Sequence, residues 1–251
     1  KYLLEIMKKS LNDALMNELA WKAPKYFNSS YTLCQIGMGT FCFVDFYFDT
    51  PQMLNENFVY VGLFIASLGN IVYLIQTLRG KVQPNRVTWF LWALAPLIAF
   101  AAQIKQGVGV QSLLTFSIGF FPLIIFLASF VNKKAFWKIT KLDMFFGSFS
   151  VIGLILWFLT GIGNLAILFS LIADGMASLP TIIKSYNHPE SENAFAYGTT
   201  ATGAILTILT IRNWNFATYS FPFLILFTNS LLAVLIYSKI GKGLNRGNKL
   251  L

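Results

Sequence analysis

The stretch KVQPNRVTWFLWALAP, residues 81–96, places a proline and two cations directly against an apolar run that carries Trp89 and Trp92. Proline ends a helix because it lacks an N–H group and disfavours helical backbone at the residue before it. Tryptophan is enriched where a helix enters a bilayer. The stretch therefore predicts a turn at a membrane surface, followed by a helix that re-enters the hydrocarbon.

The composition is that of a membrane protein. Of the 251 residues, 56% are hydrophobic and only 12% are charged, whereas about 25% of the residues in a soluble domain are charged. Transmembrane helices need about 20 apolar residues. Seven segments approach or reach this length, at 58–78, 88–104, 111–131, 143–160, 163–183, 194–211 and 217–238. Because they lack the alternation of membrane strands, the expected fold is all-α and polytopic, with seven transmembrane helices.

The cations are unevenly distributed between the loops. The net charge is +9, but the cations are not gathered on one soluble face, as in a nucleic-acid-binding protein. The loops after the first, third, fifth and seventh segments contain Arg79, Lys81, Arg86, Lys133, Lys134, Lys138, Lys141, Lys184, Lys239, Lys242, Arg246 and Lys249. The other loops between segments contain only Lys105 and Arg212. By the positive-inside rule, the C-terminus is expected in the cytoplasm.

Residues 1–57 precede the first segment and allow two topologies. Residues 2–19 have apolar residues at helical spacing among charged ones, which predicts an amphipathic helix at the membrane interface. Residues 31–48 are borderline in length for a span and carry Asp45. If they cross the membrane, the chain has eight spans and a cytoplasmic N-terminus. If they do not, the basic N-terminal residues lie on the outer side.

A weak internal repeat organises the rest of the chain. Shifts of 105 and 100 residues superpose Pro84 on Pro189, Trp92 on Tyr197 and Ser129 on Asn229. The predicted parts are a first three-helix repeat (58–131), a linker helix (132–160), a second repeat (161–239) and a basic cytoplasmic tail (240–251). Because a single span separates the two triplets, both begin on the outer side and are expected to be parallel repeats.

The basic corner with Pro84 and the re-entering helix resemble the proline-glutamine-loop (PQ-loop) superfamily. Its members include the SWEET and semiSWEET sugar transporters and lysosomal exporters of cystine and cationic amino acids, and the three-plus-one-plus-three count agrees with it. The signature dipeptide is absent, because the first repeat has Gln83-Pro84 in reverse order and the second has Pro180-Thr181. Pro84, Pro180 and Pro189 are candidate hinges. Since proline kinks are common in membrane helices, a purely structural role stays open for each.

The segment NRVTWFLWALAPLIAFAAQIKQGVGVQSLLTF, residues 85–116, resembles the PnuC-type vitamin transporters of bacteria, with Trp89 and Trp92 as a tryptophan pair and Gln103 farther along. The chain as a whole looks most like uncharacterised bacterial membrane proteins built on the same plan. These resemblances imply a SWEET-like fold in a bacterial inner membrane. They also imply a transported solute such as a sugar, an amino acid or a vitamin precursor.

Asp174 is the only acid deep within the predicted spans. A charge in hydrocarbon costs at least about 2.5–3.5 kcal/mol, so this side chain should face the bundle interior, pair with a cation or be protonated. One interpretation is a carboxylate that couples transport to protons. The other is a neutral acid that hydrogen-bonds a neighbouring helix, where Asn70 is the candidate partner.

A site for a small polar solute needs amide and hydroxyl groups beside a flat aromatic face. The residues expected to form it are Asn70, Trp89, Trp92, Ser129, Tyr197 and Asn229. Ser129 and Asn229 resemble, by their position in the third helix of each repeat, the paired polar residues of the SWEET pocket. For Trp89 and Trp92 the alternative is an aromatic belt at the membrane interface, and Trp92 lies deeper.

No nucleophile elbow, phosphate loop or HExxH motif is present, so no enzyme and no cofactor are expected. His188 beside Glu190 and Glu192 in a loop is too weak a pattern for a metal site. The expected function is transport of a small polar solute by alternating access. A non-transporting receptor and a structural or assembly protein are the alternatives on this fold. The expected partners are the lipid bilayer and the solute, without nucleic acid, and a homo-oligomer is left open.

Overall fold

The computed structural model describes residues 48–49, 53–132, 134, 137–141, 143–148, 151, 155 and 163–241. The predicted N-terminal amphipathic helix, nearly all of segment 31–48, most of the linker helix and almost all of the basic tail lie outside these residues. The chain divides into two compact units, one of residues 52–211 and 217–251 and the other of residues 1–51 and 212–216.

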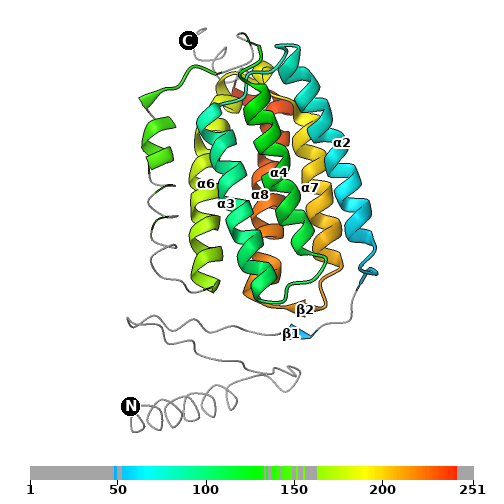
Figure 1. Cartoon of the computed structure of the whole chain (residues 1–251). Helices are drawn as coiled ribbons and strands as arrows, with labels where there is room; N and C mark the ends of the chain where they lie inside the picture. Colours follow the sequence, from blue (N-terminus) through cyan, green and yellow to red (C-terminus); the bar gives the residue numbers. More distant parts are fainter. Residues whose placement is uncertain are drawn as a thin grey trace, which may run out of the picture. The chain divides into compact units, whose positions relative to one another are not determined.

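The larger unit is a bundle of helices (Figure 1). Its described elements are α2 (Phe58–Leu78), α3 (Arg86–Lys105), α4 (Ser112–Ala128), α6 (Gly163–Asn187), the short 3-10 helix η1 (Pro189–Ser191), α7 (Ala194–Leu209) and α8 (Phe216–Ser238). Four of these helices, α2, α3, α6 and α8, are long and apolar enough to cross a membrane, while α4 and α7 are apolar but shorter. The prediction of a mostly helical chain with several helices long and apolar enough to cross a membrane is confirmed.

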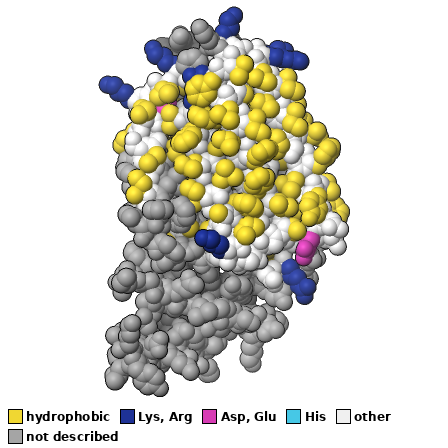
Figure 2. Space-filling view, viewed as in Figure 1, with side chains coloured by type: hydrophobic (Ala, Val, Ile, Leu, Met, Phe, Trp, Pro, Cys, Tyr) yellow, Lys and Arg dark blue, Asp and Glu magenta, His cyan; other side chains and the backbone are white. Residues whose placement is uncertain are grey.

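The surface of the bundle is apolar between its two ends. Figure 2 shows hydrophobic side chains over most of the face in view, with Lys and Arg mainly at one end. Large side chains point outward from several helices; Phe64 of α2 is 65% exposed and Phe227 of α8 is 69% exposed. Because soluble monomers rarely expose large contiguous apolar patches, this surface is suited to contact with lipid.

The loops α2–α3 and α6–α7 lie at the same end of the bundle. The N–H group of Gln83 in the first loop donates to the carbonyl oxygen of Ser191 in the second, at 3.0 Å. Both α2 and α6 therefore run towards this end, and the C-terminal end of α8 lies there as well (Figure 1). We call it the basic end, because Arg79, Lys81 and Lys239 are located there.

Asparagine begins the helix after each of these loops. The side-chain oxygens of Asn85 and Asn193 each accept hydrogen bonds from two amide groups in the first turn of α3 and α7. Such N-caps satisfy amides that have no partner within the helix. The two helices thus begin 108 residues apart, not 105 as in the gapless comparison of the repeat. This offset matches Trp89 rather than Trp92 with Tyr197.

Helices α2 and α7 approach each other closely through small residues. A Cβ atom on Gly62 would lie 3.0 Å from the carbonyl oxygen of Gly203, and one on Gly203 would lie 2.8 Å from the carbonyl oxygen of Gly62. A Cβ atom on Gly69 would lie 2.9 Å from Cα of Ala196. Small residues at such spacing allow close packing of membrane helices. Elsewhere, α3 packs on α4 and α6, and α2 also contacts α4.

The described part of the smaller unit is a short strand pair. Strand β1 (Phe48–Asp49) pairs antiparallel with β2 (Asn213–Trp214), with Phe48 opposite Trp214. No feature of the sequence predicted this pair. It places Phe48, the last residue of segment 31–48, in extended backbone.

Candidate functional site

A cavity lies inside the bundle, and α2, α3, α4, α6, α7 and α8 all contribute to its wall. The lining residues are Asn70, Trp89, Trp92, Ile118, Pro122, Asp174, Ala196, Tyr197, Thr200, Ile225, Thr228 and Asn229. The cavity has a volume of about 40 Å³, which is room for about three water molecules. Pockets for drug-sized ligands start at about 300 Å³, so a solute larger than a few water molecules would require the helices around the cavity to move apart.

Most of the residues predicted to bind solute meet at this cavity. Asn70, Trp89, Trp92, Tyr197 and Asn229 all line it, although they come from four different helices, and Asp174 joins them from a fifth. The amide side chains of Asn70 and Asn229 each lie close to a threonine hydroxyl group. Nδ2 of Asn70 lies 3.4 Å from Oγ1 of Thr200, and Nδ2 of Asn229 lies 3.5 Å from Oγ1 of its neighbour Thr228. The wall is thus mixed, with amide, hydroxyl, carboxyl and aromatic groups.

Ser129 does not line the cavity, contrary to the prediction. It follows the last residue of α4, and its hydroxyl group donates to the carbonyl oxygen of Phe126 at 2.6 Å. Arg86, at the start of α3, donates from Nε to Oγ of Ser129 at 3.1 Å and from Nη2 to the carbonyl oxygen of Ser129 at 2.7 Å. Ser129 therefore ties the end of α4 to the start of α3, a connection that repeat matching does not predict.

The tryptophan pair is part of the interior. Trp89 is only 3% exposed and lies in a buried cluster with Tyr73 and Tyr197, so the aromatic-belt interpretation is wrong for this residue. The ring centroids of Trp89 and Trp92 are 5.4 Å apart, and those of Trp92 and Tyr197 are 6.4 Å apart. Nε1 of Trp89 is buried and has no hydrogen-bond partner among the described residues. A group that donates hydrogen bonds is therefore left without an acceptor beside the cavity.

The carboxyl group of Asp174 also lacks a partner. The residue is 2% exposed, and no hydrogen bond or ion pair joins its side chain to any other residue that the structure describes. The expected bond from Asn70 is not formed, because Nδ2 of Asn70 donates to the carbonyl oxygen of Ala66 at 2.9 Å and faces Thr200. The nearby indole of Trp92 donates to the main-chain oxygen of Asp174 at 3.4 Å. Asp174 is thus a buried acid that faces a cavity without a counter-charge.

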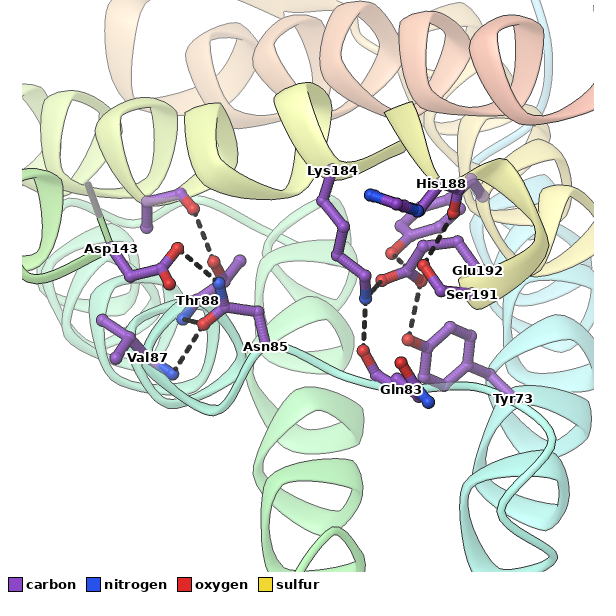
Figure 3. A network of polar contacts seen from close by, with 12 residues as sticks. Tyr73, Gln83, Asn85, Val87, Thr88, Asp143, Lys184, His188, Ser191 and Glu192 are labelled. Atoms are coloured by element: carbon purple, nitrogen blue, oxygen red, sulfur yellow. Dashed lines mark hydrogen bonds and ion pairs between the residues drawn. The ribbon is translucent and has the colours of Figure 1, made fainter. Parts of the chain in front are cut away.

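A second polar cluster lies at the basic end, centred on Glu192 (Figure 3). Oε1 of Glu192 is 2.6 Å from Nζ of Lys184, and these two side chains are 0% and 1% exposed. Oε2 of Glu192 accepts hydrogen bonds from the hydroxyl groups of Tyr73 at 2.7 Å and Tyr197 at 2.9 Å. We call these four residues the Glu192 network. Both oxygens of this buried carboxylate have charged or hydroxyl partners.

The Glu192 network joins the two loops of the basic end and reaches the cavity. Nζ of Lys184, on α6, also donates to the carbonyl oxygen of Gln83 in the α2–α3 loop, and lies 4.9 Å from the ring centroid of Trp137. Tyr197 belongs to both sites, since its hydroxyl group binds Glu192 while the residue lines the cavity. Tyr197 thus connects the loop contacts of the basic end with the cavity wall.

The remaining part of Figure 3 anchors the start of α3. Nδ2 of Asn85 donates to Oδ1 of Asp143 at 2.7 Å, and Oδ2 of Asp143 accepts from the N–H group of Thr140 at 2.5 Å. On the other side, the hydroxyl group of Thr88 donates to the carbonyl oxygen of Ala177 in α6 at 2.9 Å. The segment around residues 140–143 is thus bound to the cap of α3.

The three candidate hinge prolines occupy different positions. Pro84 directly precedes the cap residue of α3, and its carbonyl oxygen accepts from the N–H group of Trp137 at 3.1 Å. Pro189 is the first residue of η1. Pro180 lies inside α6, which continues to Asn187. Hinge motion at these residues remains a prediction.

Glu192 was missed from the sequence, where it reads as one of two solvated acids in a loop. Glu190 has the expected exposure, with a side chain that is 57% exposed, but Glu192 is buried. One sequence signal favours burial in hindsight: Glu192 directly precedes the cap residue of an apolar helix, and Tyr197 follows it one helical turn into α7. Its two other partners, Lys184 and Tyr73, come from separate helices and carry no local signal.

Comparison with protein-family models, curated proteins and solved structures yields no match for this chain.

Proposed function

We propose that this protein is a carrier that moves a small polar solute across a bacterial inner membrane by alternating access, with the cavity as its central binding site. The observation that carries the proposal is a cavity lined by residues of six helices, five of which contribute polar or aromatic groups, inside a bundle whose face in Figure 2 is largely apolar. Buried polar groups without partners are costly, so the Trp89 indole and the Asp174 carboxyl group favour a site that is completed by a ligand.

The Glu192 network supplies a closure on one side of this site. Lys184, Glu192 and the carbonyl oxygen of Gln83 connect α6, the α6–α7 loop and the α2–α3 loop. In the proposed mechanism these contacts hold the basic end closed and separate when the solute leaves towards that side. The two triplets predicted from the repeat are the parts that move, with Pro84, Pro180 and Pro189 as candidate hinges.

Asp174 is the residue proposed to couple transport to protons. It faces the cavity from the middle of α6 and has no described cation beside it. In proteoliposomes that contain the purified protein, uptake is expected to depend on the pH gradient, and Asp174→Asn is expected to abolish this dependence. Uptake by the variant with unchanged pH dependence would leave Asp174 a structural residue.

The binding site is tested by a thermal-shift screen of the purified protein against sugars, amino acids, amines and precursors of B vitamins. Trp92→Ala and Asn229→Ala should each remove the stabilisation by the active class of compound. Phe227→Ala is the matched control, since this residue is 69% exposed and lies on the same helix as Asn229. It should keep the full shift.

The screen also separates the proposed carrier from its alternatives. Stabilisation that persists in both cavity variants would remove the site assignment. A compound that binds in the cavity but does not cross proteoliposome membranes would indicate a receptor. The absence of any cavity ligand would favour a structural or assembly protein.

A further inference from the structure

The cavity is lined by an acidic residue and by no basic residue that the structure describes. Asp174 is the only charged residue among the lining residues, and no Lys, Arg or His of the described chain lines the cavity. Lys184, which lies on the same helix as Asp174, is already paired with Glu192 at 2.6 Å. A carboxylate in a membrane interior needs a cation or a proton, and the described part of this protein offers Asp174 no cation.

The aromatic side chains beside Asp174 suit an ammonium group. Trp89 and Trp92 stand at 74° to each other and Trp92 and Tyr197 at 73°, so the three rings form angled walls rather than a flat stack. Cations are attracted to the faces of such rings within about 6 Å. Trp92 also contacts the main chain of Asp174 through its indole N–H group. Because Asp174, Trp92 and Tyr197 line the same cavity, a cation held in it can lie near both the carboxyl group and the aromatic rings.

A bare metal ion fits this wall less well. Hard metal cations prefer several oxygen ligands, whereas three lining residues are aromatic and only one is an acid. Among the described residues, no three or more His, Cys, Asp or Glu side chains are grouped so that they could hold a metal ion. The wall therefore favours an organic cation over an inorganic one.

We infer that the solute of the proposed carrier is a small organic cation with an ammonium nitrogen, which exchanges with a proton at the carboxylate of Asp174. This inference rests on the transport function proposed above. One carboxylate neutralises either one proton or one ammonium group. Each cycle therefore moves one organic cation in one direction and one proton in the other, and no net charge crosses the membrane.

The surroundings of Asp174 supply no competing acid or base except a tyrosine. From α7, the only titratable lining residue is Tyr197, whose hydroxyl group is engaged with Glu192. The lining residues from α2, α3, α4 and α8 are amide, hydroxyl, aromatic or apolar. Proton exchange in the cavity is thus assigned to Asp174.

Paired probes of equal shape test the charge requirement. Choline and its neutral carbon analogue 3,3-dimethylbutan-1-ol have nearly the same size, and ethanolamine and ethylene glycol form a smaller pair. Binding to the purified full-length chain is measured by isothermal titration. The two cations should bind, while the neutral partners should bind at least about tenfold more weakly, the scale of one desolvated cation–π contact. Sodium chloride serves as the inorganic probe.

Variants identify the groups responsible. Asp174→Asn should reduce binding of the cations by about a hundredfold or more, as expected for a buried charge partner. Asp174→Glu should restore part of the affinity, and Trp92→Leu should lower it by about tenfold. Glu56→Gln is the control for a lost acid, since Glu56 is exposed and lies outside the cavity; its affinity should be unchanged.

The outcomes separate this inference from the carrier proposal. Equal binding of the neutral partners, binding of sodium alone, binding by none of the four organic probes, or cation binding that survives Asp174→Asn would each overturn the inference. The carrier proposal survives these results if neutral solutes bind in the cavity and Trp92→Ala removes their binding.

Exchange is tested with choline, because its charge is permanent and it carries no ammonium proton. Proteoliposomes are loaded with choline and a pH-sensitive dye and diluted into choline-free medium. The interior should become acidic as choline leaves, at a rate that a potassium diffusion potential does not change. Asp174→Asn should abolish the acidification. Choline efflux without proton entry would overturn the exchange.

Discussion

Two acids are buried in this protein, and their surroundings differ completely. Glu192 at the basic end is held by Lys184, Tyr73 and Tyr197, so that both carboxylate oxygens have partners within 2.9 Å. Asp174 in the cavity has no partner among the described residues. The first arrangement stabilises the protein in one conformation. The second leaves a buried carboxyl group that a proton or a cation from outside the chain would have to neutralise.

The largest effect on stability is expected from breaking the ion pair between Lys184 and Glu192. Glu192→Gln leaves the Lys184 ammonium group buried without its counter-charge, which is expected to lower the free energy of unfolding by about 3–5 kcal/mol. The measurement is reversible unfolding in mixed micelles. The double variant Lys184→Met with Glu192→Gln should recover much of this loss, because no charge is then left alone. Strictly additive losses would show that the pair is not coupled.

Tyr197→Phe separates the two regions, because this residue contributes to both. The variant loses a hydrogen bond to a charged group, so unfolding should become easier by about 1.5–3 kcal/mol, while the ring at the cavity stays. Solute affinity in the closed conformation should change little, and the rate of opening at the basic end should rise. Tyr60→Phe is the control, since Tyr60 is 51% exposed. An equal effect of both variants would contradict the role of the Glu192 network.

Asp174→Leu should raise the free energy of unfolding, whereas the variants of the Glu192 network should lower it. Replacing an unpartnered buried acid with an apolar side chain of similar size removes an unfavourable burial, so the free energy of unfolding should rise by about 1–3 kcal/mol. Uptake should be lost at the same time. A clear loss of stability would instead show that Asp174 has an internal partner, and the comparison with Glu192 would no longer hold.

Ser129→Ala should have the smallest effect, on stability alone. The variant loses the bond from Nε of Arg86 and the bond to the carbonyl oxygen of Phe126, but it keeps the bond from Nη2 of Arg86 to the carbonyl oxygen of residue 129. The expected loss is about 1 kcal/mol. Solute binding should be unchanged, because Ser129 does not line the cavity. Weaker solute binding in this variant would show that Ser129 contributes to the solute site.

The helices could be predicted because their signals are local. Length, apolar composition and prolyl turns located six of the seven predicted segments to within a few residues of the described helices, and α4 and α7 ended earlier than their apolar segments suggested. The cap of α3 coincides with the turn at Pro84. These features depend on neighbours along the chain, which a single sequence contains.

The site was predicted only in part because its geometry depends on packing between helices. Polar and aromatic residues in the middle of spans are expected at the centre of a bundle, and Asn70, Trp92, Tyr197 and Asn229 do line the cavity; their role in solute binding stays a prediction. Ser129 was misplaced because a gapless repeat does not show that Arg86 reaches it. Glu192 was missed because its burial requires Lys184, Tyr73 and Tyr197, which the fold brings together from three helices.

The glycine contact between α2 and α7 joins the two predicted triplets. Gly62 and Gly69 of α2 lie against α7, and Gly203 of α7 lies against α2, so the shallow groove at these glycines is covered by a helix of the other predicted triplet. A fragment that ends in the linker would therefore expose this groove to lipid and lack its natural complement. Co-expressed fragments should recombine through it, and a lone triplet should become stable only by pairing with a second copy of itself.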